Sequence, residues 1–264
     1  MLELNNVWKV FEEGTINEKV ALRGIDLHLE DGEFVTIIGG NGAGKSTLLN
    51  AVAGTWPISN GSISINGVDI TGIPGYKRAA YIGRVFQDPM QGTASEMQLE
   101  ENLALALRRG KRRGLCWGVS NNERQMFKEL LSSLGLGLED RMTAQIGTLS
   151  GGQRQAVSLL MATINTPDLL LLDEHTAALD PATACKVLDI SDKIIKEKKL
   201  TCLMITHNMS DAINYGNRLI MMNEGKIIID IAGEEKKHLD KEYLLHKFAE
   251  VAGVQEETDE VLLS

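Results

Sequence analysis

The chain has 264 residues, of which 43% are hydrophobic and 24% are charged, and its formal net charge is −9. This size and balance are typical of one globular α/β domain, or of such a domain with a subdomain inserted into it. The net negative charge and the 5% aromatic content argue against DNA or RNA as the main partner, because nucleic-acid-binding proteins carry a net basic face.

Neither a leader segment nor a membrane span is visible in the sequence. The first residues lack a basic segment followed by an apolar run, and no apolar stretch reaches the roughly 18 residues of a transmembrane helix. Cys116, Cys185 and Cys202 have neither zinc-ligand nor redox-motif spacing, which favours reduced thiols in a cytosolic protein. We therefore expect another chain to do any membrane spanning.

Strand and helix patterns alternate along most of the chain. In chain order, we expect strands within residues 2–29, a buried strand at 34–38, a helix at 46–53, a strand at 62–65, helical segments across 97–134, a helix ending near 162, and strands at 169–172, 203–206 and 219–222. This alternation predicts an α/β fold with a parallel sheet, into which a helical segment at about 89–164 is inserted.

The chain after Gly233 is charged. A short amphipathic helix is expected around Tyr243, Leu244 and Phe248, and the acidic stretch 255–260 is expected to be frayed.

A glycine-rich loop directly follows the 34–38 strand and precedes a helix. Residues 39–46 read Gly-Gly-Asn-Gly-Ala-Gly-Lys-Ser, which fits the phosphate-loop (Walker A) pattern in the context that this motif requires. Glycines let backbone N–H groups converge on phosphate oxygens, and the helix N-terminus adds the positive end of its dipole. Lys45 is expected to reach the β- and γ-phosphates, and Ser46 to ligate Mg²⁺. The residues expected to bind ATP here are Gly39, Asn41, Gly42, Ala43, Gly44, Lys45, Ser46 and Thr47.

The apolar strand at 169–172 ends in two carboxylates, Asp173 and Glu174. An aspartate at this place can hold a magnesium ion, and the adjacent glutamate can polarise an attacking water. Together with the phosphate loop, this pair predicts a nucleotide hydrolase.

A second short motif, Leu149-Ser150-Gly151-Gly152-Gln153, begins a helix and offers another anion site. With this pentapeptide the chain resembles the ATP-binding cassette family, whose signature it is. The resemblance covers about residues 2–230. It implies that Ser150, Gly151, Gly152 and Gln153 bind ATP held by a second cassette, so that two chains close on two ATP molecules.

The resemblance also implies an architecture: a P-loop NTPase (RecA-like) core with an antiparallel β-subdomain and the inserted α-helical subdomain at about 89–164. The cassette is then expected to span residues 1–235, followed by a short charged tail at 236–264.

Further positions match the family in order. Gln87 looks like the Q-loop glutamine, which contacts magnesium and the attacking water. Ala178 and Asp180 look like the D-loop, and His207 looks like the switch histidine that contacts the γ-phosphate. The implied catalytic residues are Glu174, His207 and Gln87, and the implied magnesium ligands are Ser46, Gln87 and Asp173.

Three features have two interpretations each. Phe11 looks like the aromatic that stacks on adenine, although a core aromatic is the alternative. His175 stands where many cassettes have proline, and a surface variant is favoured over a hydrogen bond near the catalytic water. The basic run from Arg108 to Arg113 is favoured as a solvated helix end over a contact with anionic lipid or a membrane partner.

The resemblance is strongest to bacterial importer ATPases, which implies an ATPase on the cytoplasmic face of the cell membrane. Its implied partners are a second cassette, an integral membrane permease and a substrate-binding protein, with an amino acid as the transported class. A soluble assembly ATPase of iron–sulfur cluster biogenesis is the alternative, because that family shares every nucleotide motif.

Overall fold

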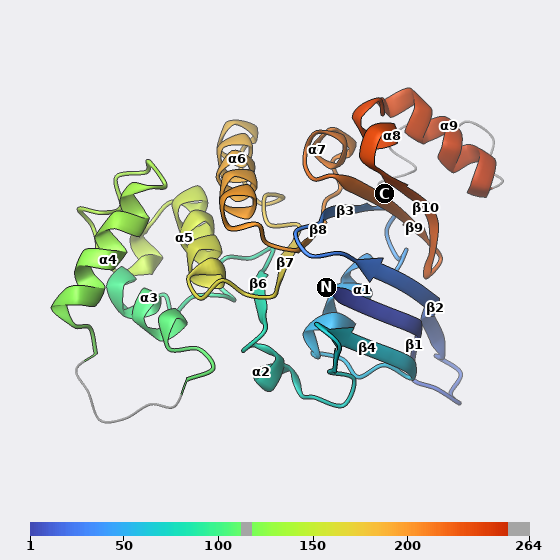
Figure 1. Cartoon of the computed structure of the whole chain (residues 1–264), viewed down its shortest axis with the longest axis horizontal. Coiled ribbons are helices and arrows are strands. Elements are labelled where there is room, and N and C mark those ends of the chain that lie inside the picture. The colour runs from blue at the N-terminus through green and yellow to red at the C-terminus, as the bar shows by residue number, and fades with distance from the viewer. Residues whose placement is uncertain (112–117, 253–264) are drawn as a thin grey trace.

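The computed structural model describes residues 1–111 and 118–252 (Figure 1). Arg112, Arg113, Cys116 and the acidic stretch 255–260 lie outside the described residues. Among the described residues, no helix combines the length and the apolar character that crossing a bilayer requires.

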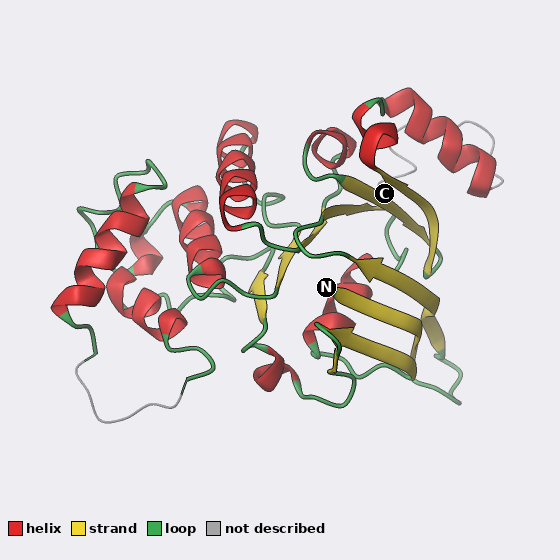
Figure 2. Cartoon of the chain, viewed as in Figure 1, coloured by secondary structure: helices red, strands yellow, loops and turns green. Residues whose placement is uncertain are grey.

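Four strands near the N-terminus form an antiparallel sheet in the order β2-β1-β4-β5 (Figure 1, Figure 2). Their bounds are β1 Leu2–Phe11, β2 Lys19–Leu29, β4 Asn60–Ile65 and β5 Val68–Asp69. Leu2 pairs with Leu29 on one side and with Ile65 on the other, and all three side chains are buried. The alternating pattern of the sequence thus gives one apolar face to this sheet.

A second, six-stranded sheet has the order β10-β9-β3-β8-β7-β6, and every neighbouring pair except β10–β9 is parallel. Its strands are β3 Phe34–Ile38, β6 Ile82–Val85, β7 Leu169–Asp173, β8 Cys202–Ile205, β9 Arg218–Asn223 and β10 Lys226–Ala232. The predicted parallel sheet is confirmed. The predicted strand at 203–206 is one residue out of position, because β8 ends before Thr206.

Helices cover both faces of this parallel sheet. The helices of the core are α1 Lys45–Ala53, α5 Gly151–Thr163, α6 Pro181–Lys198 and α7 Met209–Asn214, with the short α2 Gly75–Arg78 on the way to β6. Leu171 packs in the cluster with α1, whereas Leu170 packs in the cluster with α5 and α6. The two faces are therefore buried alternately along each strand, as a parallel sheet requires.

The helical stretch predicted at 97–134 is two helices, α3 Leu99–Leu107 and α4 Asn121–Ser132. Helix α3 ends before Gly110, whose φ of +75° lies in the left-handed region that ends helices. With the 3-10 turn Ile146–Thr148, these two helices lie beyond the β6 edge of the sheet and share an apolar cluster with α5 (Figure 1).

The last described elements are α8 Gly233–Lys237 and α9 Lys241–Ala252. Leu239 and Leu244 are buried against β9 and β10, which confirms the amphipathic helix expected near Tyr243.

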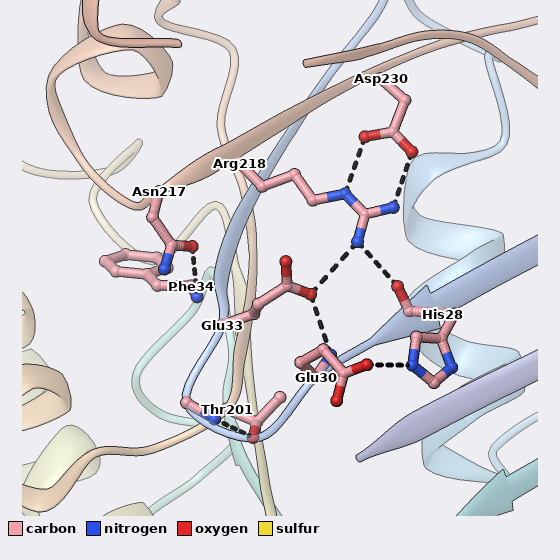
Figure 3. A network of polar contacts seen from close by, with 9 residues as sticks. His28, Glu30, Glu33, Phe34, Thr201, Asn217, Arg218 and Asp230 are labelled. Atoms are coloured by element: carbon pink, nitrogen blue, oxygen red, sulfur yellow. Dashed lines mark hydrogen bonds and ion pairs between the residues drawn. The ribbon is translucent and has the colours of Figure 1, made fainter. Parts of the chain in front are cut away.

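One polar network fixes the corner where the two sheets meet. Arg218 on β9 donates two hydrogen bonds of 2.7 Å to Asp230 on β10, one of 3.1 Å to Glu33, and one of 2.7 Å to the backbone oxygen of His28 on β2 (Figure 3). The guanidinium side chain is 16% exposed. A single arginine thus joins strands of both sheets.

Candidate nucleotide site

The phosphate loop connects β3 to α1, and its glycines are required by its shape. Gly39 and Gly44 have φ values of +147° and +101°. A Cβ on Gly39 would lie 2.2 Å from the Met222 backbone oxygen, and a Cβ on Gly44 would lie 2.7 Å from that of Ala21. Any other residue at these two places would strain or move the loop.

Lys45 opens helix α1 and is buried, with 5% of its surface exposed. Its ammonium donates to the backbone oxygens of Gly39 at 2.5 Å and Gly40 at 3.0 Å. Burial lowers the pKa of Lys45, and the charges of Glu174 and Asp173 oppose that shift. The loop therefore holds its cation next to both carboxylates.

A cavity of about 670 Å³ lies over this loop. It brings together most of the residues that the sequence predicts for the site, and its lining also includes Glu12, Asn17, Lys19 and Ala21, which no motif indicates. The predicted residues that line it are Phe11, Asn41, Gly42, Ala43, Gly44, Lys45, Ser46, Thr47, Gln87, Glu174 and His207.

Glu174 and His207 both line this cavity and are in contact with each other. His207 Nε2 lies 2.6 Å from Glu174 Oε1, while His207 Nδ1 has no hydrogen-bond partner among residues 1–111 and 118–252. Glu174 follows β7 and His207 follows β8, the neighbouring strand. Neighbouring parallel strands end at the same edge, so the two side chains meet although 33 positions separate them in the sequence.

Asp173 ends β7 beside a different partner. Its Oδ2 accepts a hydrogen bond of 3.0 Å from Arg84 on β6, and both side chains are 15% exposed. Asp173 lines a second cavity, of about 650 Å³, and not the nucleotide cavity, whereas Gln87 lines both. No motif in the sequence indicates Arg84.

The predicted metal ligands are an alcohol, an amide and a carboxylate, which are the oxygen ligands that Mg²⁺ prefers. Among the described residues, no group of three or more His, Cys, Asp and Glu side chains could hold a metal ion. Magnesium in nucleotide sites is usually bound by one or two protein side chains together with phosphates and water. Ser46, Gln87 and Asp173 therefore fit this ion chemically.

Phe11 ends β1 and is half-buried at the rim of the nucleotide cavity. Its ring meets Trp56 edge-to-face with centroids 5.2 Å apart, and Lys9 Nζ lies 4.8 Å from the ring centroid. Phe11 thus combines a contact with another aromatic ring and access to the cavity. Its stacking on adenine stays a prediction.

The signature motif begins helix α5 and does not line the nucleotide cavity of its own chain. Ser150 caps the helix, since its Oγ accepts from the Gln153 backbone N–H at 3.3 Å. The Gln153 side chain in turn accepts from the Ser150 backbone N–H. A Cβ on Gly152 would lie 2.1 Å from Thr183 Cγ2 on α6. The glycine therefore allows α5 and α6 to approach closely.

The D-loop leads into helix α6. Asp180 caps this helix by accepting from the Thr183 backbone N–H at 3.1 Å, and the hydrogen bonds to Thr183 lower the pKa of the Asp180 carboxyl. Neither Asp180 nor Ala178 lines the nucleotide cavity.

The surface interpretation of His175 is wrong. The side chain is 2% exposed and its Nε2 lies 3.1 Å from Ser191 Oγ on α6. Complete burial lowers the pKa of His175 to about 4, so the ring is neutral at pH 7. The sequence could not reveal this, because the burial comes from a helix that begins six residues later.

The basic run is only partly a solvated helix end. Arg108 pairs with Glu123 on α4 at 2.8 Å, with 21% of each side chain exposed. Arg109 donates to the Ala162 backbone oxygen near the end of α5 at 2.9 Å. These two arginines hold α3, α4 and α5 together, which corrects the favoured interpretation for them.

The comparisons with known proteins agree with this geometry. The family model "ABC transporter" matches residues 22–177. A tyrosine transport ATP-binding protein of Clostridioides difficile is 43% identical over 94% of this chain and 98% of its own length. A methionine import ATP-binding protein of Enterococcus faecalis is 36% identical over 92% of this chain and 70% of its own length.

Solved structures extend the likeness to the fold. A dimeric ATP-binding cassette in a post-hydrolysis state with ADP and Pi superposes with a TM-score of 0.75 at 29% identity, over 88% of this chain and 98% of that one. An ATP-binding cassette of an ABC transporter in its ADP conformation superposes with a TM-score of 0.76 at 28% identity, over 96% and 97%. The chain belongs to the ABC transporter family, and it is an ATP-binding cassette ATPase related to the ATP-binding subunits of importers.

Proposed function

We propose that this ATPase powers the uptake of an amino acid through a separate membrane permease. The observation that carries its catalytic part is the nucleotide cavity, which is lined by Lys45, by Ser46 and by the Glu174–His207 pair. This arrangement supplies a phosphate cradle, a base for water and a hydrogen-bonding ring in one space.

In the proposed mechanism, the loop N–H groups and Lys45 hold the triphosphate of ATP. Glu174 takes the proton of an attacking water, and His207 orients that water and the γ-phosphate. Ser46, Gln87 and Asp173 would hold Mg²⁺, which would neutralise charge on the transferred phosphoryl group. Ser150 and Gly152 of a second cassette close over the same ATP, as the dimeric structural relative supports.

The second cavity, beside Gln87, is the proposed docking place of the permease. Its lining includes Tyr76, which is 77% exposed, and Gln91. Met90 nearby is also exposed, at 41%. Exposed tyrosine and methionine side chains next to a groove suit a protein–protein contact. Because Gln87 lines both cavities, it would contact the nucleotide in one and the permease in the other.

The transported class is inferred from the relatives. The proteins named above act on tyrosine and on methionine, by their names, and both are amino acids. Uptake further implies a substrate-binding protein outside the membrane and places this chain on the inner face of the cell membrane.

The first test is purification of the tagged chain from its own cells in mild detergent, comparing wild type, Tyr76→Ala and Tyr243→Ala. Tyr243 is a matched control, because it is 38% exposed on α9, away from the groove. We expect a multi-spanning membrane protein with wild type and Tyr243→Ala, and its loss with Tyr76→Ala. Recovery of a soluble cluster-assembly scaffold without any membrane protein would contradict transport and support the iron–sulfur alternative.

The substrate class is tested separately. The chain, the co-purified permease and its binding protein are reconstituted in vesicles, and phosphate release is measured with tyrosine, methionine, thiamine or spermidine. Stimulation by an amino acid alone is expected, and stimulation by thiamine or spermidine alone would contradict the proposed class.

A further inference from the structure

Arg84 occupies an unusual place in the parallel sheet. On β6, Ile82 packs in the apolar cluster under α1, and Arg84 shares that face because side chains alternate along a strand. On the neighbouring β7, Leu169 and Leu171 lie in the same cluster, so Asp173 shares the face as well. The sheet thus places a guanidinium and a carboxylate side by side, on a face where the preceding side chains of both strands are apolar.

The guanidinium is held by three side chains, on β7, on α1 and in the loop that follows α1. It donates to Asp173 Oδ2 at 3.0 Å, to Asn50 Oδ1 on α1 at 2.9 Å, and to Thr55 Oγ1 at 3.2 Å. It also lies over the ring of Phe86, 4.6 Å from the centroid. A planar fork with this many contacts fixes the direction of the carboxylate more firmly than a flexible ammonium group could.

Asn50 extends the network to the phosphate loop. While its Oδ1 accepts from Arg84, its Nδ2 donates to the Ser46 backbone oxygen at 2.7 Å. One guanidinium is therefore connected to two of the proposed magnesium ligands: directly to Asp173, and through a single amide to the backbone of Ser46. No other role in the proposed mechanism uses Arg84.

We propose that Arg84 is a positioning residue for the metal site, holding Asp173 by Oδ2 so that Oδ1 is presented to Mg²⁺, and bracing Ser46 through Asn50. The inference rests on the magnesium site of the proposed function. Hydrogen-bonded partners of a metal-ligating carboxylate act in this way in other metal sites, where their removal weakens metal binding about 10- to 100-fold.

The test measures Mn²⁺ binding to the full chain saturated with ADP, by electron paramagnetic resonance, for wild type, Arg84→Gln, Arg84→Lys and Arg124→Gln. Arg124 is the matched control, because it pairs with Glu100 in the α3–α4 region and touches neither metal ligand. Arg84→Gln should weaken Mn²⁺ binding about tenfold. ADP affinity measured in EDTA should stay unchanged in all four proteins.

Arg84→Lys separates geometry from charge. It keeps the positive charge and loses the fork, so its Mn²⁺ affinity should stay closer to that of Arg84→Gln than to that of wild type. Thr55→Val removes one hydrogen bond of the fork while leaving the Arg84–Asp173 pair, and it should weaken Mn²⁺ binding by a smaller factor even if the arginine variants fold poorly.

Three results would overturn the inference. Unchanged or tighter Mn²⁺ binding in Arg84→Gln would show that Arg84 does not position the site. Full rescue by Arg84→Lys would reduce its role to charge. If ADP-bound wild type itself binds no Mn²⁺, the proposed magnesium site fails together with the inference.

Discussion

Glu174 is held in a conformation that few residues other than glycine adopt. Its φ of +49° lies in the left-handed region, which costs a glutamate about 1 kcal/mol or more. This conformation, directly after the end of β7, places the Glu174 carboxylate 2.6 Å from His207. Backbone strain of this kind persists where the surrounding structure fixes it, and here the parallel sheet does so.

Replacing Glu174 by glutamine should abolish turnover while leaving ATP binding intact. The amide cannot accept the proton of the attacking water, so phosphate release should fall about 10²- to 10⁴-fold. ATP should then trap a closed dimer, seen by size-exclusion chromatography. Glu12→Gln, at another part of the cavity wall, is the control. Turnover close to wild type in Glu174→Gln would remove Glu174 from its role.

His175 should make folding stability sensitive to acid. Its pKa is about 4 in the folded chain and about 6.5 when unfolded, so the unfolded state binds more protons between these values. The stability that the neutral ring provides is fully present above pH 6.5 and falls by about 3 kcal/mol as the pH drops through 4. Urea unfolding of wild type and His175→Asn at pH 7.5, 6, 5 and 4 measures this difference. Parallel pH curves for the two proteins would contradict it.

At the scale of elements, the first turn of helix α5 has a structural function and, in the proposed mechanism, also a chemical one. Ser150 and Gln153 form a capping box that satisfies N–H groups of the first turn. The same serine belongs to the signature motif and is proposed to face the ATP of a second chain. Helix α4 carries an equivalent capping box, formed by Ser120 and Glu123, without any nucleotide motif.

Ser150→Ala and Ser120→Ala should therefore cost similar stability and differ in activity. Each loses a helix cap worth about 1 kcal/mol, measurable by urea unfolding. Only Ser150→Ala also loses a hydrogen bond to a charged phosphate, so its ATP turnover should fall about tenfold or more. Equal turnover in the two variants would mean that Ser150 acts only as a cap.

At the scale of the whole molecule, the Arg218 network connects the antiparallel sheet to the parallel one (Figure 3). The guanidinium is mostly buried, and its loss leaves Asp230 and Glu33 without their partner. Arg218→Gln should lower the free energy of unfolding by about 2 kcal/mol, between the values of surface and buried pairs.

The control for this variant is Lys193→Gln, which breaks an exposed pair with Glu197 and should change stability by less than about 0.5 kcal/mol. Urea unfolding gives both numbers. Equal effects of the two variants would show that the network does not join the sheets energetically.

Contiguous motifs made the core of the site predictable from the sequence. The phosphate loop and the Asp173-Glu174 pair can each be recognised from a few neighbouring residues. The strand or helix pattern beside each motif then predicts where it lies in the fold. The alternating and apolar runs likewise predict strands at the positions of β1 to β4 and of β7 to β9, with ends that differ by a residue or two, whereas they do not predict β6 and β10.

The contacts that the sequence did not reveal join residues far apart in the chain. Arg84 and Asp173 are 89 positions apart, Arg218 and His28 are 190 positions apart, and the burial of His175 depends on Ser191. Strand order decides which side chains meet in such pairs, and no local sequence pattern predicts strand order.

The strand order also bears on synthesis. Strand β8 lies between β3, which leads into the phosphate loop, and β7, which leads into Glu174, yet it is translated after both. A nascent chain that has not yet released residues 202–205 from the ribosome lacks the strand that joins the two halves of the nucleotide site. We therefore expect an unfinished copy of this protein to lack an assembled nucleotide site until this late strand has joined the sheet.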